Sequence, residues 1–299
     1  MSNLHQPPLV IGLGELLWDC FADSRRPGGA PANVAFQAGQ LGGRGVVCSR
    51  VGRDPLGDEL VEFLAAQGLD TQGIQRDADH PTGTVTVDAT RADHPEYMIH
   101  QNVAWDHLQP TADWQRLIAQ AAAVCFGTLA QRSPESRETI HRLLALTDKT
   151  CLVVCDVNLR QQWFDRPTIE RSLAASRAAK LNEHEVVVLA DLLETDSAEP
   201  VAFARELQRR FGVRMVCITR AERGCLLVSP DETVDAPGVP VEVADAVGAG
   251  DAFTAAWIVG QLRGWPLARQ AELANRVGAL VAGRPGAMPP LRDEFARLL

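Results

Sequence analysis

Short apolar runs alternate with stretches of helical spacing along the whole chain. The runs are rich in valine, isoleucine and leucine and are bounded by turn residues, so they predict buried strands. They cover residues 9–13, 46–51, 122–126, 151–155, 213–218 and 225–228. Helices are predicted between and after these runs, at 31–41, 134–146, 199–211 and 249–262. This alternation predicts an α/β fold with a mainly parallel sheet between layers of helices.

One segment departs from that alternation. Residues 82–88 (TGTVTVD) follow a period of two, and residues 96–100 (EYMIH) can pair with them. A period of two means that one face is buried and the other is free, as in a small antiparallel sheet. A small sheet beside a large α/β body predicts a lid over a site.

Length and charge restrict the class of protein. The chain has 299 residues with 29 basic and 38 acidic side chains, a formal net charge of −9, and its two lysines are Lys149 and Lys180. An acidic chain without a basic tract is not expected to bind nucleic acid. No apolar run reaches the ~18 residues that predict a membrane span. Because no linker or repeat interrupts the pattern, we expect a single domain over residues 1–299.

The cysteines indicate a reducing compartment. Their number is odd, no CxxC pair is present, and most lie in apolar runs, so they are expected to be reduced core residues of a cytoplasmic protein. They are Cys20, Cys48, Cys125, Cys151, Cys155, Cys217 and Cys225. The seven histidines are scattered without metal-ligand spacing, which argues against a structural transition-metal site.

Several phosphate-binding and catalytic motifs are excluded. Gly12 and Gly14 begin like a dinucleotide fingerprint, but Leu17 stands where the third glycine is needed, which disfavours a nicotinamide oxidoreductase. Neither lysine follows a glycine, so there is no P-loop, and no GxSxG elbow occurs. The charge of a bound phosphoryl group would therefore have to be met by other groups.

The strongest local signal is the segment 245–253 (DAVGAGDAF), which runs into the apolar stretch 249–262. Its glycines permit a tight turn, and a helix N-terminus offers unpaired N–H groups to an anion. A carboxylate at that place fits a base, Asp251, that deprotonates a hydroxyl while neighbouring N–H groups hold a transferring phosphoryl group. The alternative is that Asp251 only caps the helix.

This segment resembles the C-terminal signature of the ribokinase-like (PfkB) carbohydrate kinases. Five more segments, all earlier in the chain, resemble motifs of that family and occur in the expected order. The first has the fructokinase-like form, and the resemblance extends from about residue 9 to residue 295. The motifs are 28–35 (GGAPANVA), 51–57 (VGRDPLG), 156–160 (DVNLR), 180–185 (KLNEHE) and 219–224 (TRAERG). The resemblance implies the ribokinase-like three-layer fold with a discontinuous β lid from about 12–30 and 82–104.

The same resemblance implies ATP-dependent phosphorylation of a sugar hydroxyl, and it assigns roles to residues. Asp251 would be the base, with an anion hole at Gly248, Ala249 and Gly250. The sugar would be bound by Asp19, Gly28, Gly29, Asn33 and Arg160. The nucleotide would be bound by Asn182, Thr219, Gly224 and Asn275. Glu185 would act on Mg²⁺ through water. A monovalent cation (K⁺) would be held by the loop 281–290 together with Asp245 and Val247 on the facing loop.

Some residues depart from the family pattern. Gln101 stands where fructokinases usually carry a lid arginine, Trp105 replaces a small residue, Ala221 replaces a glycine, and Pro290 stands where a serine often ligates the cation. Because the first motif has the fructokinase-like form, fructose is still the first expectation for the substrate. The alternatives are another sugar, a sugar acid of the 2-keto-3-deoxygluconate type or a nucleoside, and, outside catalysis, a sugar- or nucleotide-sensing module. The resemblance also implies a homodimer that forms through the lid.

Overall fold

The apolar runs form one large sheet in the computed structural model, which describes residues 6–88 and 96–299. Neighbouring strands are parallel from β11 to β5, whereas β12 and β13 are antiparallel to their neighbours. The strand order is β13 (Thr233–Ala236), β12 (Cys225–Val228), β11 (Met215–Thr219), β10 (Ala178–Asn182), β9 (Leu152–Asp156), β8 (Ala123–Phe126), β1 (Leu9–Leu13), β4 (Arg44–Gly52) and β5 (Ile74–Asp77).

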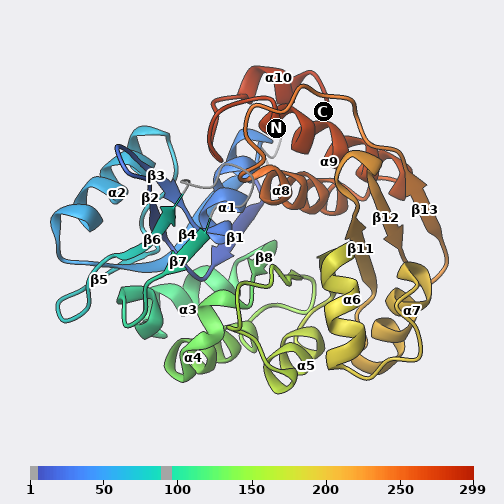
Figure 1. Cartoon of the computed structure of the whole chain (residues 1–299), viewed down its shortest axis with the longest axis horizontal. Helices are drawn as coiled ribbons and strands as arrows, with labels where there is room; N and C mark the ends of the chain where they lie inside the picture. The colour runs from blue at the N-terminus through green and yellow to red at the C-terminus, as the bar shows by residue number, and fades with distance from the viewer. Residues whose placement is uncertain (1–5, 89–95) are drawn as a thin grey trace, which may run out of the picture.

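Side chains of the central strands point alternately to two helical layers. On β1, Ile11 and Leu13 belong to one hydrophobic core cluster, while Val10 belongs to another. The first cluster packs on α3 (Ala112–Ala119), α4 (Pro134–Leu144), α5 (Arg166–Ala174), α6 (Glu183–Leu192) and α7 (Pro200–Phe211). The second packs on α1 (Ala30–Gln40), α8 (Ala249–Leu262), α9 (Leu267–Ala282) and α10 (Arg292–Ala296), so helices cover both faces (Figure 1).

A separate small sheet lies at one end of the large one, beside α2 (Pro55–Ala66), at the left of Figure 1. Its order is β3 (Arg25–Gly28), β2 (Leu17–Cys20), β6 (Gly83–Asp88) and β7 (Glu96–Ile99). The parallel pairing of β2 with β6 joins two distant segments of the chain. The predicted small sheet is therefore confirmed. Residues 89–95 of the predicted lid range lie outside the described residues.

Most predicted elements agree with the structure to within one or two residues at each end. The segment 249–262 is helix α8 over the predicted range, and 225–228 is strand β12. Strand β10 was missed, because Lys180 and Asn182 are polar residues in a segment of only five residues. Its lysine is nevertheless only 7% exposed.

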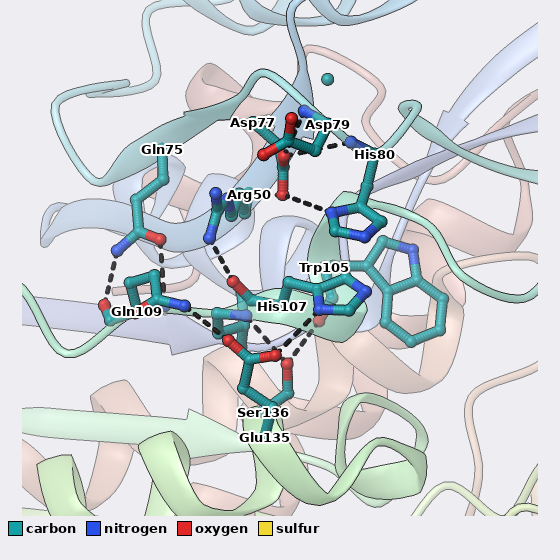
Figure 2. Close-up of polar contacts among 12 residues, drawn as sticks. Arg50, Gln75, Asp77, Asp79, His80, Trp105, His107, Gln109, Glu135 and Ser136 are labelled. Carbon is teal, nitrogen blue, oxygen red and sulfur yellow. Dashed lines mark hydrogen bonds and ion pairs between the residues drawn. The ribbon is translucent and has the colours of Figure 1, made fainter.

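The two chain segments that flank the β6–β7 hairpin are anchored in one polar cluster (Figure 2). His80 precedes β6 and His107 follows β7, and their rings stack with centroids 3.6 Å apart. The carboxylate of Asp77 accepts the backbone N–H groups of Asp79 and His80, at 2.8 and 3.1 Å, and pairs with Arg50 on β4 at 2.9 Å. These contacts hold the entry and exit of the β6–β7 hairpin against the large sheet.

Further features of the described residues bear on the class of protein. No helix within residues 6–88 and 96–299 has the length and apolar character needed to cross a membrane. All seven cysteines lie in these ranges, and each is free of a disulfide.

Candidate active site

A cavity of about 610 Å³ lies between the small sheet and the carboxyl ends of the central strands. Asn182 ends β10 and Thr219 ends β11, and both line it, as expected for the carboxyl edge of a parallel sheet. From the small sheet, Asp19 and Gly28 line the opposite wall. The other predicted residues in the lining are Gly29, Asn33, Arg160, Val247, Gly248, Gly250 and Asp251.

The turn before α8 has a conformation that requires glycine. Gly248 has φ of 77°, in the left-handed region, and a Cβ there would lie 2.4 Å from the Cβ of Ala287. The first N–H groups of a helix have no acceptor within the helix, so those of Gly250 and Asp251 are available to an anion. Ala249 differs: its N–H donates to the carbonyl of Ala246 at 3.3 Å, and it is not part of the cavity lining.

Asp251 meets Asn33 across the cavity floor. The Asn33 Nδ2 donates to Asp251 Oδ2 at 2.7 Å, although the two residues are 218 positions apart in the sequence. The pKa of Asp251 is raised to about 6, by burial first and by the nearby Asp156, against the Asn33 hydrogen bond and Lys180, which lower it. A carboxylate in this state is mostly ionised at neutral pH and can accept a proton, as a general base must.

A buried ion pair lies directly under this turn. Lys180 Nζ donates to both carboxylate oxygens of Asp156, at 2.9 and 3.0 Å, and Thr254 Oγ1 donates to Oδ2 at 2.8 Å. A Cβ on Gly250 would lie 3.7 Å from the same Nζ, and Lys180 lines the cavity. Lys180 had no predicted role. The signal for its burial is a lysine within an apolar strand, because a buried lysine needs a partner of opposite charge.

The small sheet contributes a second carboxyl group, on Asp19. Burial raises the pKa of Asp19 to about 6, although Arg160 and Arg26 oppose the shift. Gly28 on β3 pairs with Leu17 on β2, and a Cβ on Gly28 would lie 2.6 Å from Asp19 Oδ2. Gly29 has φ of 115°, and a Cβ there would lie 2.5 Å from the carbonyl oxygen of Glu15. These glycines keep the wall of the cavity open beside Asp19.

Glu15 is a third carboxyl group of the cavity, and the sequence analysis missed it. It is 3% exposed, and burial raises its pKa to about 7. The signal in the sequence is a single charged residue in the apolar stretch GLGELLW.

Asn182 and Glu185 form a capping box at the start of α6. Asn182 Oδ1 accepts the N–H of Glu185 at 2.9 Å, and Glu185 Oε2 accepts the N–H of Asn182 at 2.7 Å. Glu185 Oε1 accepts the N–H of Leu159 at 2.8 Å, so both of its oxygens hold backbone donors. The residue is 3% exposed and lies outside the cavity lining. Its predicted action on Mg²⁺ stays a prediction, and only a contact through water fits these bonds.

Asp245 and Val247 lie at the entrance to the turn. Asp245 Oδ1 accepts the N–H of Val247 at 3.0 Å, and Oδ2 accepts the N–H of Gly286 at 3.1 Å and Arg26 Nη1 at 2.6 Å. The loops predicted to hold a monovalent cation are therefore adjacent. The Asp245 carboxylate is paired with a guanidinium from the small sheet, so the cation site stays a prediction.

Gly224 and Asn275 lie together beyond the cavity lining. Gly224 has φ of 86°, and a Cβ there would lie 2.1 Å from the carbonyl oxygen of Ala236. Asn275 on α9 donates to the carbonyl of Pro237 at 3.0 Å. Both residues thus shape the segment 236–238, and their predicted contact with a nucleotide is not tested.

Two residues that depart from the family pattern lie outside the cavity lining. Trp105 is fully buried, with the Arg132 guanidinium 3.9 Å from its ring centroid, so it packs in the body. Gln101 is exposed. Two further contacts connect the small sheet with the body beside the cavity: Arg26 with Asp245, and Gln161 Nε2 with the carbonyl of Tyr97 at 2.6 Å.

The model of the pfkB family carbohydrate kinases matches residues 10–294, and the chain belongs to that family. It is 31% identical to a protein of Pyrococcus horikoshii described as a sugar kinase (97% of this chain, 95% of the other) and 31% identical to a fructokinase of Klebsiella pneumoniae (96% and 98%).

Solved structures agree with this assignment. The P. horikoshii protein in complex with ATP superposes with a TM-score of 0.84 at 30% identity, covering 97% of this chain and 100% of the other. A fructokinase of Vibrio cholerae with fructose, ADP and potassium shares the fold, with a TM-score of 0.83 at 24% identity and coverage of 98% and 99%. The protein is thus a carbohydrate kinase of the pfkB family.

Proposed function

We propose that the protein transfers the γ-phosphoryl group of ATP to a primary hydroxyl of a ketose, with fructose as the first candidate. The observation that carries this proposal is Asp251, which lines the cavity in the first turn of α8 and is held by Asn33 at 2.7 Å. Fructokinases at 26–31% identity over 90–96% of this chain support the choice of sugar.

In this proposal Asp251 takes the proton of the sugar hydroxyl as its oxygen attacks the phosphorus in line. The N–H groups of Gly250 and Asp251, with the dipole of α8, face the negative charge of the transferring group. Lys180 adds a fixed positive charge under the same turn, shared with Asp156. Asp19 and Asn33 accept hydrogen bonds from sugar hydroxyls on the small-sheet side.

ATP would lie toward Asn182 and Thr219, the strand ends that line the cavity opposite the small sheet. A magnesium ion bound to its phosphates would supply charge neutralisation, and it would keep most of its water ligands. The donors present fit that ion only through water, because the oxygens of Glu185 hold backbone N–H groups and Asp156 holds Lys180. A monovalent cation at Asp245 would have to displace Arg26.

A sugar acid is the second candidate, favoured by one observation. Arg26 and Arg160 both line the cavity near Asp19, and a guanidinium is well suited to bind a carboxylate. A 2-keto-3-deoxy sugar acid would use this pair, whereas fructose would not need it.

The deciding experiment measures ADP release from purified protein with a panel of fructose, other ketoses, ribose, nucleosides and 2-keto-3-deoxygluconate. We expect the highest kcat/KM with fructose. Turnover with another compound and none with fructose would replace the substrate. Sugar binding by calorimetry without turnover on any compound would instead favour a sensing module.

Pairing of two copies through the small sheet is also proposed. The edge strand β7 exposes Tyr97 (49%) and Met98 (63%), which are large apolar side chains to leave in water. Sedimentation of the protein and of Met98→Glu tests this: we expect a dimer for the first and a monomer for the second. A monomeric unchanged protein would remove the proposal.

A further inference from the structure

Two buried oxygens in the cavity have no hydrogen-bond partner among the described residues: Glu15 Oε2 and Asn33 Oδ1. Both residues line the cavity, and they are 3% and 4% exposed. A buried polar atom without a partner costs free energy, so such atoms usually have one in the working state. Asn33 already uses its Nδ2 to hold Asp251, which places its free oxygen near the base. The natural partner for both oxygens is the bound sugar.

Glu15 has the highest pKa of the three carboxyl groups that line the cavity. Its pKa is raised to about 7, by burial first and by the Asp251 charge, against backbone N–H groups and Arg160. Arg160 is itself exposed, which weakens its effect. Two carboxylates in one desolvated pocket cannot both be charged cheaply, and Asp251 has the amide of Asn33 to stabilise its charge. The remaining charged groups of this cavity are Asp19, Arg26 and Lys180.

A protonated Glu15 could donate a hydrogen bond, which an ionised carboxylate cannot. The carboxylates of Asp19 and Asp251 and the free oxygen of Asn33 can only accept hydrogen bonds. A sugar also carries oxygens that only accept, such as its ring oxygen, and these need a donor from the protein. An un-ionised carboxyl group has one O–H to donate.

We propose that Glu15 is a sugar-binding residue whose un-ionised carboxyl group donates a hydrogen bond to a sugar oxygen beside the hydroxyl that Asp251 deprotonates. This inference rests on the proposed function, because it takes the sugar and the role of Asp251 from it. It adds a specificity-determining residue that the family motifs quoted above do not include.

The test compares Glu15→Gln, which keeps the size and a neutral donor, with Glu15→Leu, which keeps the approximate size and has no donor. We expect Glu15→Gln to keep kcat/KM for the sugar within about threefold at pH 7, while Glu15→Leu raises the sugar KM at least about tenfold, since about 1.4 kcal/mol of lost hydrogen bonding gives a factor of ten. The ATP KM should stay unchanged in both. Unchanged sugar KM in Glu15→Leu, or equal losses in the two variants, would overturn the proposal.

The pH profile separates binding from a structural effect. In the unchanged protein, kcat/KM should fall as pH rises past about 7, because Glu15 loses its proton; in Glu15→Gln this fall should disappear. A fall that persists in Glu15→Gln would overturn the proposal even if Glu15→Leu does not fold.

Calorimetry with the sugar alone gives a readout that does not depend on Asp251: weaker binding to Glu15→Leu supports the inference, and equal binding contradicts it. Failure of the proposed function would appear differently, as sugar binding without turnover in the unchanged protein.

Discussion

Lys180 and Asp156 form a two-point ion pair, with N–O distances of 2.9 and 3.0 Å, under the turn that opens α8. Both side chains are nearly inaccessible to solvent, at 9% and 4% exposure. The pair joins β9 to β10, and through Thr254 it also joins the sheet to α8. It therefore fixes the height of the turn above the sheet.

Lys180→Met should lower the free energy of unfolding by about 3–5 kcal/mol, because it leaves the Asp156 charge buried without a partner. Urea unfolding followed by circular dichroism measures this. The double variant Lys180→Met/Asp156→Leu should recover much of the loss, since no charge then stays buried. An unchanged midpoint in the single variant would contradict the assignment.

Asp251→Asn should lower kcat by about 10²–10⁴-fold, the usual contribution of a general base, while sugar binding is kept. Steady-state ADP release and sugar calorimetry measure the two effects. Asp191→Asn, at an exposed position on α6, is the matched control and should have no effect. Near-normal turnover in Asp251→Asn would show that Asp251 is not the general base.

The same substitution should change stability in a pH-dependent way. The pKa of Asp251 is raised from 3.8 to about 6 by burial, so its ionised form destabilises the folded state above about pH 6. This penalty disappears as pH falls toward 3.8, where the carboxyl is protonated in both states. Asp251→Asn should thus raise the melting temperature at pH 7.5 and have a much smaller effect near pH 4. An equal effect at both pH values would contradict the shift.

Gly248→Ala should impair both stability and turnover. Its φ of 77° disfavours any side chain, and the new Cβ would collide with Ala287 at 2.4 Å. We expect a loss of about 1–3 kcal/mol from the backbone strain alone, and a kcat reduced by about 10–10³-fold if the N–H groups shift. Gly264→Ala is the control, because φ there is 64° and nothing lies within 4 Å of a Cβ. It should show the strain without the loss of activity.

Asp77→Asn should destabilise the attachment of the small sheet. Although burial pushes the pKa of Asp77 up, the N–H groups of Asp79 and His80 and the charge of Arg50 hold it below its ordinary value. Removal of the charge breaks the ion pair, while Arg50 keeps the carbonyl of His107, and we expect a loss of about 1–3 kcal/mol. Thermal unfolding of Asp77→Asn and of the exposed control Asp79→Asn tests this. Equal melting temperatures for the two variants would contradict the anchoring role.

Sequence reasoning predicted the elements whose pattern is local. The apolar runs gave the central strands, and the glycines before 249–262 gave the turn and its helix. Strand β10 was missed because the burial of Lys180 depends on Asp156, a residue 24 positions away on another strand. Local polarity could not show that the charge would be neutralised.

The candidate site divides in a similar way. The family resemblance assigned roles to Asp19, Asn33 and Asp251, all of which line one cavity. Glu15 was missed because its burial depends on the segment at Gly29 and Ala30, which packs against it and is 14–15 positions away in the sequence. The pairing of Asp245 with Arg26 joins residues 219 positions apart, and nothing in either local sequence predicts it.

The contact between Asn33 and Asp251 also sets an order of events during synthesis. Helix α1 emerges early from the ribosome and packs on β1 and β4, but its core cluster also includes Ala256 and Trp257 of α8. Until those residues have been translated, the side of α1 that contacts α8 and the part of the sheet face under α8 stay uncovered, and a nascent chain at that stage is prone to aggregate. The proposed base and its amide partner can meet only after that docking, so a growing chain should acquire phosphoryl-transfer activity in one step, late in its translation.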